Sequence, residues 1–157
     1  MKLQPKIKTV WMIQRLLFAV SLAVLLFMMY ELPALMGDGY LRLLPTGMLA
    51  GLVLLGGIVW AVVWPRLLYE TWQYELRTEE LYLERGIVTR IKTVVPLRRV
   101  QHLDVSQNVL EREFDLGRLV VYTAGTMNST VVVPGLLYED AEALRNEIRH
   151  FVVEDAV

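Results

Sequence analysis

The sequence predicts an integral membrane protein with two transmembrane helices followed by one small α+β domain. Three observations predict this plan. Two long apolar stretches fill the first third of the 157-residue chain. Apolar and polar residues then alternate over several short segments, as is typical of half-buried strands. Near the C-terminus, the apolar spacing becomes that of an amphipathic helix.

The first apolar stretch runs from Leu16 to Tyr30, and its helix is expected to cover residues 11–36. The second runs from Leu43 to Trp64, and neither stretch contains a charged side chain. About 20 apolar residues suffice to cross a bilayer core of roughly 30 Å, so both stretches qualify as spans. A cleaved signal peptide is the alternative for the first, but no Ala-x-Ala-like site follows it and a second span comes next.

Basic residues predict the orientation of the spans. Lys2, Lys6, Lys8 and Arg15 precede the first span, whereas the 37–42 connector carries one basic residue. Short loops rich in Lys and Arg stay in the cytoplasm. We therefore expect a multi-pass protein of the cell (inner or plasma) membrane, with both termini in the cytoplasm and the connector outside.

Small residues predict how the two helices pack. In lipid, helices associate through close packing at small side chains rather than through hydrophobic burial. Three pairs have small-xxx-small spacing: Ala19/Ala23, Gly57/Ala61 and Gly47/Gly51. No ionisable residue lies deep in either stretch, and such residues mark transport pathways. The hairpin is therefore interpreted as an anchor rather than as a transporter.

The charge balance changes where the chain leaves the membrane. Residues 1–66 hold six basic and two acidic side chains (net +4), and residues 67–157 hold ten basic and fifteen acidic ones (net −5). The acidic part lacks the basic footprint of a nucleic-acid-binding domain. The chain has no cysteine, which excludes disulfides and Cys-ligated metals. We expect an anchor at 1–65 and one soluble domain at 66–157.

Alternating patterns predict the strands of the soluble domain. Residue Pro96 suggests an edge strand or a strand end, because proline lacks a backbone donor. A single helical turn is expected at 109–115. Strands at 119–122 and 130–133 flank a turn at 125–129 and are interpreted as a hairpin. Four further segments with this alternation precede them: 68–76, 81–87, 93–97 and 100–105.

After Pro134-Gly135, the apolar period becomes helical. Basic residues lie towards the end of this predicted helix and acidic ones near its start, which matches the helix dipole. Strands followed by one helix that covers an open sheet form an α+β or capped-barrel plan. The residues expected on the buried helix face are Leu137, Ala141, Leu144, Ile148, Phe151 and Val152.

Several motifs resemble those of the YdbS-like bacterial pleckstrin-homology (PH) family. The resemblance covers residues 66–152, and the two preceding spans match the usual arrangement of that family. It implies a PH-like fold, with two near-orthogonal antiparallel sheets capped by the C-terminal helix, and implies little about activity. The motifs are Trp72-x-Tyr74, Leu81-x-Leu83-x-x-Gly86-Ile87-x-x-Arg90, Val95-Pro-Leu-x-Arg99-Val-Gln101, Leu110-Glu-Arg112-x-Phe114-x-Leu116-Gly-x-Leu119 and Thr123-Ala-Gly125.

No constellation of residues predicts catalysis. His102 and Asp104 are expected on one face of a strand, where the carboxylate could orient the imidazole. No nucleophile in a suitable context accompanies them, so a partly exposed strand histidine is the favoured interpretation. Two histidines without an acidic cluster also fall short of a metal site. We expect neither an enzyme nor a bound cofactor or metal.

The segment 85–99 is the main electrostatic feature of the soluble domain. Each cation near an anionic leaflet contributes about 1 kcal/mol of attraction. The alternative is that these side chains are solvated or pair with Glu84 and Asp104, which we favour because the whole domain is acidic. The segment contains no acid and five cations: Arg85, Arg90, Lys92, Arg98 and Arg99.

Two functions remain open from the sequence. The favoured hypothesis is a membrane-anchored module that docks a protein partner, either a related membrane protein or a second copy of itself. Val109, Leu110 and Phe114 form the candidate partner surface for this function. The alternative is a domain that binds anionic lipid headgroups through the 85–99 segment.

Overall fold

The computed structural model describes residues 1–31, 47–124 and 130–154. The chain divides into two compact units. One is a helical unit of Trp11–Arg66, and the other combines Met1–Val10 with Leu67–Val157.

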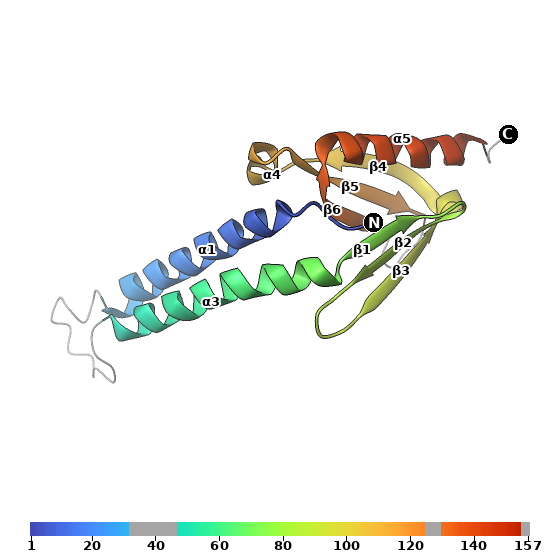
Figure 1. Cartoon of the computed structure of the whole chain (residues 1–157). Coiled ribbons are helices and arrows are strands. Elements are labelled where there is room, and N and C mark those ends of the chain that lie inside the picture. Colours follow the sequence, from blue (N-terminus) through green and yellow to red (C-terminus); the bar gives the residue numbers. More distant parts are fainter. Residues whose placement is uncertain (32–46, 125–129, 155–157) are drawn as a thin grey trace. The chain divides into compact units, whose positions relative to one another are not determined.

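The helical unit is built from the two apolar helices (Figure 1). The first, α1 (Ile7–Leu26), continues as a π-helical segment, η1 (Phe27–Glu31). The second is α3 (Met48–Thr71). Both are long and apolar enough to cross a membrane, with a mean hydropathy of 2.1 in each candidate span. The predicted connector at 37–42 lies outside the described residues.

Both helices extend beyond their predicted limits towards the soluble part of the chain. Helix α1 begins at Ile7 rather than at residue 11, and α3 continues through Pro65 to Thr71 rather than ending at Trp64. The predicted strand at 68–76 is therefore wrong over its first half. Extending an existing helix adds one hydrogen bond per residue, and the alternation over 68–71 is too short to oppose it.

Two of the three small-residue pairs make the predicted contact between the helices. Ala19, Ala23 and Ala61 are buried, with at most 3% of their surface exposed. A Cβ atom at Gly57 would clash with the Cβ atom of Ala19, so only glycine allows this close approach. Among the described residues nothing lies within 4 Å of a Cβ atom built at Gly47 or Gly51. That third pair therefore does not form the contact.

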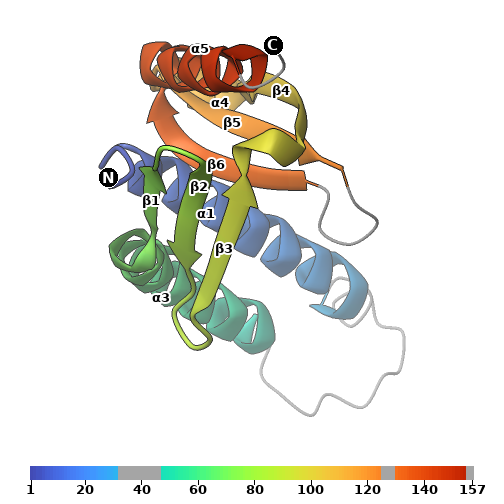
Figure 2. The same ribbon diagram turned by 90° about the vertical axis from the view of Figure 1, so that its right-hand side faces the viewer.

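The other unit contains two three-stranded antiparallel sheets and a C-terminal helix (Figure 2). The short helix η2 (Leu97–Arg99) joins the sheets, and α5 (Tyr138–Glu154) covers the second one. This arrangement is the α+β, PH-like plan that the sequence predicted. The first sheet consists of β1 (Gln73–Leu76), β2 (Glu80–Arg85) and β3 (Ile91–Pro96), and the second of β4 (Val100–Ser106), β5 (Leu116–Thr123) and β6 (Thr130–Leu137).

Several predicted strand limits differ from the structure. Strand β2 ends at Arg85 rather than at residue 87, and β3 begins at Ile91 rather than at residue 93, because Gly86 turns the chain at a φ of +116°, which favours glycine. Strand β6 continues through Pro134-Gly135 to Leu137, and a register shift against β5 accommodates one extra residue there. The predicted hairpin of β5 and β6 is confirmed, and its turn at 125–129 lies outside the described residues.

The predicted inward face of the C-terminal helix is confirmed at its centre. Ala141 and Ile148 are fully buried, and Leu144 is 8% exposed. They pack with the interior side chains of the sheets. The strand residues that are completely or almost completely buried include Leu81, Leu83, Leu116, Leu119, Val121, Val133 and Leu136.

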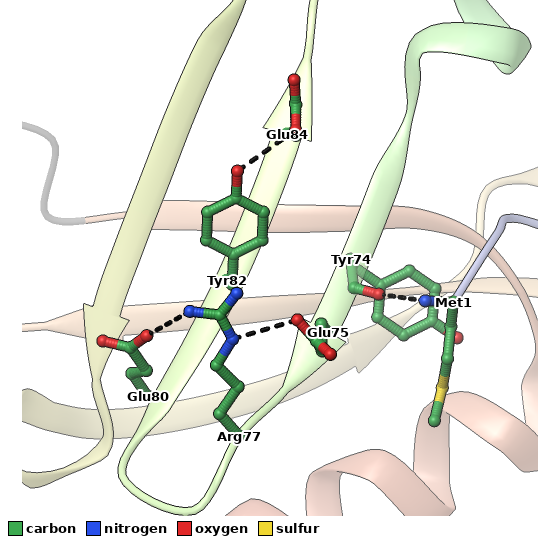
Figure 3. Close-up of polar contacts among 7 residues, drawn as sticks. All are labelled: Met1, Tyr74, Glu75, Arg77, Glu80, Tyr82 and Glu84. Carbon is green, nitrogen blue, oxygen red and sulfur yellow. Dashed lines mark hydrogen bonds and ion pairs between the residues drawn. The ribbon is translucent and has the colours of Figure 1, made fainter.

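The first residues of the chain bridge the two sheets at the side where β1 and β6 lie. The Met1 amine donates a hydrogen bond to the Tyr74 carbonyl at 2.6 Å, and the Tyr74 N–H donates to the Met1 carbonyl at 3.1 Å (Figure 3). The Gln4 N–H then donates to the Gly135 carbonyl in β6 at 2.8 Å. Leu3 and Ile7 are 2% and 0% exposed, respectively.

This packing changes the predicted domain boundary. The sequence placed all of residues 1–65 in the anchor, whereas Met1–Val10 belongs to the same compact unit as Leu67–Val157. The physical reason is burial of Leu3, Ile7 and Val10. The N-terminal leader is thus part of the PH-like domain as well as the start of the first span.

Candidate functional site

The structure divides the basic segment 85–99 into two groups. Arg85, Arg90 and Lys92 lie on the β2–β3 hairpin, whereas Arg98 and Arg99 lie in η2, beyond the other end of β3. The six residues of β3 span about 17 Å at roughly 3.4 Å per residue. The five cations therefore do not converge on one small ligand.

The β2–β3 hairpin combines cations with exposed apolar side chains. Val88 is 89% exposed in the turn, and Ile91 is 47% exposed at the start of β3. The Arg85 guanidinium lies 5.8 Å from the centre of the Trp72 ring. Lys92 is the cross-strand neighbour of Glu84. The Glu84 carboxylate also accepts a hydrogen bond from the Tyr82 hydroxyl (Figure 3).

The η2 group contributes less free charge than its sequence suggests. Arg98 forms an ion pair with Glu79 at 3.6 Å, and both side chains are about 70% exposed, at 67% and 74%. Exposed pairs of this kind contribute about 0–1 kcal/mol. The backbone carbonyl of Arg99 accepts a hydrogen bond from the Ala124 N–H. This contact ties the end of η2 to the end of β5.

Arg77 is a cation whose charged group contacts other residues of the first sheet. Its guanidinium contacts the Glu75 carboxylate at 3.0 Å and the Glu80 carboxylate at 2.8 Å, closing the β1–β2 turn (Figure 3). It also lies 4.7 Å from the centre of the Tyr82 ring. Hydrogen bonds to Glu75 and then to Glu80 raise the pKa of Arg77. These contacts make it a structural residue of the turn.

His102 and Asp104 lie on one face of β4, as predicted. The His102 Nε2 atom is 2.8 Å from the Asp104 Oδ1 atom, with both side chains largely exposed. The imidazole also lies 5.7 Å from the Tyr122 ring. In the described parts of the chain, no three His, Cys, Asp or Glu side chains are placed to hold a metal ion. The pair therefore forms an exposed contact on the strand surface.

The candidate partner surface at Val109, Leu110 and Phe114 lies on a short helix, α4 (Val109–Glu113), and its C-cap. Val109 is 80% exposed, whereas Leu110 and Phe114 are half-buried. The helix is held by a capping box: the Asn108 side chain accepts from the Glu111 N–H at 2.7 Å, and the Asn108 N–H donates to the Glu111 carboxylate at 2.9 Å.

An ion pair between the buried Glu111 and the half-buried Arg118 fixes α4 to the second sheet. Glu111 is 2% exposed. Its two carboxylate oxygens accept hydrogen bonds from Arg118 in β5, at 2.6 and 3.1 Å. Such bidentate Arg–carboxylate pairs add geometric specificity as well as energy. Val109 is consequently presented to solvent from a well-fixed turn.

An open groove of about 420 Å³ lies between β4 and α5, and the sequence did not predict it. Arg149 and Val152 lie four and seven residues after Arg145, so all three share one face of α5. This spacing is the sequence signal that could have predicted the helix wall of the groove. From the sequence, Arg145 and Arg149 were interpreted only as cations that stabilise the C-terminal end of the helix dipole. The β4 side of the groove is formed by four consecutive residues: Val100, Gln101, His102 and Leu103.

Comparison with known proteins identifies relatives of the chain. A family model described as "Bacterial PH domain" matches residues 14–152. The chain is 35% identical over 103 residues to the UPF0699 transmembrane protein YdbS of Bacillus subtilis (strain 168). That alignment covers 66% of this chain, and the chain spans 63% of the length of the relative. No solved structure matches the chain.

Proposed function

The chain belongs to the bacterial PH domain family, and we propose that it is a membrane-anchored module that docks a protein partner at the cytoplasmic face. The observation that carries this proposal is the presentation of Val109. A large apolar side chain that is 80% exposed lies on a turn held by a capping box and by the Glu111–Arg118 ion pair. Together with the half-buried Leu110 in the same turn and Phe114 at its C-cap, Val109 forms a contiguous apolar surface, and such surfaces mark interaction sites.

The topology in this proposal is supported by the N-terminal packing. Met1–Val10 and Leu67–Val157 form one compact unit, which requires them to lie on the same side of the membrane. The basic leader favours the cytoplasmic side. Alkaline phosphatase fused after Val157 should therefore be inactive, and the same enzyme inserted at Gly39 should be active. The reverse pattern would contradict the orientation.

Photocrosslinking of the full chain in its native membrane tests the docking function. A photoreactive amino acid replaces Val109 in one variant and Leu110 in a second, while the exposed Glu139 in the first turn of α5 provides the control position. Docking predicts a discrete protein adduct from the α4 positions and none from position 139. An adduct between two copies would identify self-association. Absence of an adduct at both α4 positions would contradict the proposal.

Anionic lipid is the second candidate ligand, and the β2–β3 hairpin favours it. The 89% exposed Val88 lies between Arg85 and Arg90, so an apolar tip is flanked by cations that anionic headgroups attract. We rank this function second because Arg98 and Arg99 lie beyond the far end of β3 and cannot reinforce the same contact.

The absence of cysteine allows a clean test of the lipid function. Val88→Cys is labelled with an environment-sensitive fluorophore, and the full chain is placed in nanodiscs with or without phosphatidylglycerol. Lipid binding predicts a blue shift in the anionic bilayer that fades with salt, since the Debye length is about 8 Å at physiological ionic strength. Arg90→Glu together with Lys92→Glu should abolish that shift. We expect equal spectra in both bilayers.

A further inference from the structure

We propose that the groove between β4 and α5 binds an extended acidic segment of the partner protein, which adds as a strand to the edge of β4. This inference rests on the proposed docking function and names the chemistry of the partner. It places a second contact on the domain, separate from the Val109 turn.

The edge of β4 provides the backbone part of this site. In the second sheet β4 pairs with β5 on one side, and no strand of the described chain pairs with its other side. Alternate residues of an edge strand direct their N–H and C=O groups outwards, where an extended segment can pair with them. Residues 100–103 line the groove directly, and the Val100 N–H already donates to the Leu97 carbonyl. An added strand would therefore lie inside the groove and pair with β4 from Gln101 onwards.

The dimensions of the two groove walls agree with an extended occupant. Residues 100–103 of β4 span about 10 Å at roughly 3.4 Å per residue. Residues 145–152 of α5 advance about 10.5 Å at 1.5 Å per residue. The two walls are therefore of similar length, and both contribute apolar side chains, namely Val100, Leu103 and Val152.

The helix wall favours acidic side chains at alternate positions of the occupant. Arg145 and Arg149 are one helical turn apart and advance about 6 Å along the axis. Alternate side chains of an extended strand lie on one face about 6.8 Å apart. Two carboxylates in an acidic-x-acidic pattern can thus reach both guanidinium groups. Charge-assisted hydrogen bonds of this kind are stronger than those between neutral groups.

Both arginines are available to a ligand. Arg149 makes no ion pair or hydrogen bond with any described residue of the chain. Arg145 contacts the Glu142 carboxylate at 3.4 Å and donates to the Asn146 side-chain oxygen at 3.2 and 3.3 Å. These contacts lie at the surface, where such pairs are weak and a ligand can replace them. The groove therefore presents two cations on a domain whose net charge is −5 over residues 67–157.

The same charges disfavour a second copy of the chain in the groove. Pairing of two β4 edges about a twofold axis would bring the Arg145 and Arg149 side chains of both copies towards one interface, and like charges that face each other destabilise it. The groove itself also presents no acidic segment to a partner copy among its lining residues. An acidic strand from another protein fits this charge pattern better.

Selection from two peptide pools tests the site with the full chain in detergent micelles. Each pool contains ten-residue peptides with variable apolar residues, and alternate positions hold Glu in one pool and Lys in the other. The wild-type protein should enrich the Glu pool only. An N-methylated copy of an enriched peptide should not bind, because it cannot pair with the edge of β4.

Matched charge reversals connect the binding to the groove. Arg145→Glu with Arg149→Glu should weaken an enriched peptide at least about tenfold, equal to 1.4 kcal/mol, and should allow enrichment of the Lys pool. Arg90→Glu with Lys92→Glu makes the same change of charge outside the groove and should leave peptide affinity within about twofold. The single variant Arg149→Ala provides a second readout should the double reversal unfold.

Other outcomes would overturn the proposal. Failure to enrich the Glu pool, equal enrichment of both pools, or an affinity unaffected by Arg149→Ala would each do so. Binding of phosphatidylglycerol vesicles through Arg145 and Arg149 without peptide binding would assign the groove to a lipid surface instead. A discrete protein adduct at position 109 without peptide binding would overturn the groove proposal and leave the docking function in place. Absence of both the adduct and peptide binding would overturn the docking function as well.

Discussion

The helical hairpin and the PH-like domain place large and small side chains in opposite ways. In the hairpin, small residues lie at the helix contact, where Ala19 and Ala23 are each 3% exposed, while Leu17 and Phe18 are about 60% exposed, at 60% and 59%. In the PH-like domain, large residues such as Leu119 and Ile148 are fully buried. Both regions are built from the same apolar residue types.

The difference reflects the two solvents. Lipid tails are as apolar as leucine, so no free energy is gained by hiding large side chains, and close backbone approach at small residues stabilises the hairpin. Water drives large apolar groups inside, at about 25 cal/mol per Å² of buried surface. The leader Met1–Val10 follows the second rule although it begins the first span, since Leu3 and Ile7 are buried.

The largest effect is expected in the core of the PH-like domain. Ile148→Ala should lower the free energy of unfolding by about 2–5 kcal/mol, because it leaves a cavity under α5. Arg145→Ala, on the half-buried flank of the same helix, should change it by less than about 0.5 kcal/mol. Urea titration of the full chain in micelles, followed by circular dichroism, measures both. Equal losses would mean that α5 does not cover the sheet through Ile148.

A smaller loss is expected for the leader. Leu3→Ala should cost about 1–3 kcal/mol, because the segment can detach locally and so limits the penalty. Its local signature is faster hydrogen exchange of the Tyr74 N–H, which donates to the Met1 carbonyl. The exposed Lys2 offers a control, since Lys2→Ala should leave this exchange unchanged. Unaltered hydrogen exchange of the Tyr74 N–H in Leu3→Ala would contradict the packing of the leader against the PH-like domain.

The hairpin should respond to an added methyl group rather than to a removed one. Gly57→Ala forces a clash with Ala19 and should destabilise the helix contact by about 1–2 kcal/mol. Gly56→Ala is the matched control, because nothing described lies within 4 Å of a Cβ atom there. Titration with sodium dodecyl sulfate, followed by helix-to-helix fluorescence transfer, measures the difference. Equal behaviour of the two variants would contradict packing at Gly57.

The smallest effect concerns alkaline pH. Burial, with a further contribution from Asp140, raises the pKa of Tyr74 above its usual 10.0. The folded chain therefore holds this proton more tightly than the unfolded chain. The resulting stability is complete below about pH 10 and declines as pH rises through the folded pKa. Tyr74→Phe should remove this alkaline loss in urea titrations at pH 9 to 11, whereas an unchanged slope would contradict it.

The local patterns of the sequence predicted most elements of both regions. The charge-free stretches identified the two helices, Ala19 and Gly57 identified their contact, and the spacing of Ala141, Leu144 and Ile148 identified the buried face of α5. Such features depend on residues close in sequence, whose periodicity shows directly which face is apolar. The end of α3 was missed because residues 68–71 fit a strand pattern as well as a helix.

Contacts between segments far apart in the sequence became visible in the folded chain alone. Nothing in the basic leader indicated that Leu3 would be buried or that the Met1 amine would bond Tyr74, 73 residues away in sequence. Strand β3 separated Arg90 and Arg99, which the sequence had grouped, and folding brought Arg149 beside Val100 in one groove. Periodicity shows that a face is apolar or charged, whereas the segment that lies against it is selected by long-range packing.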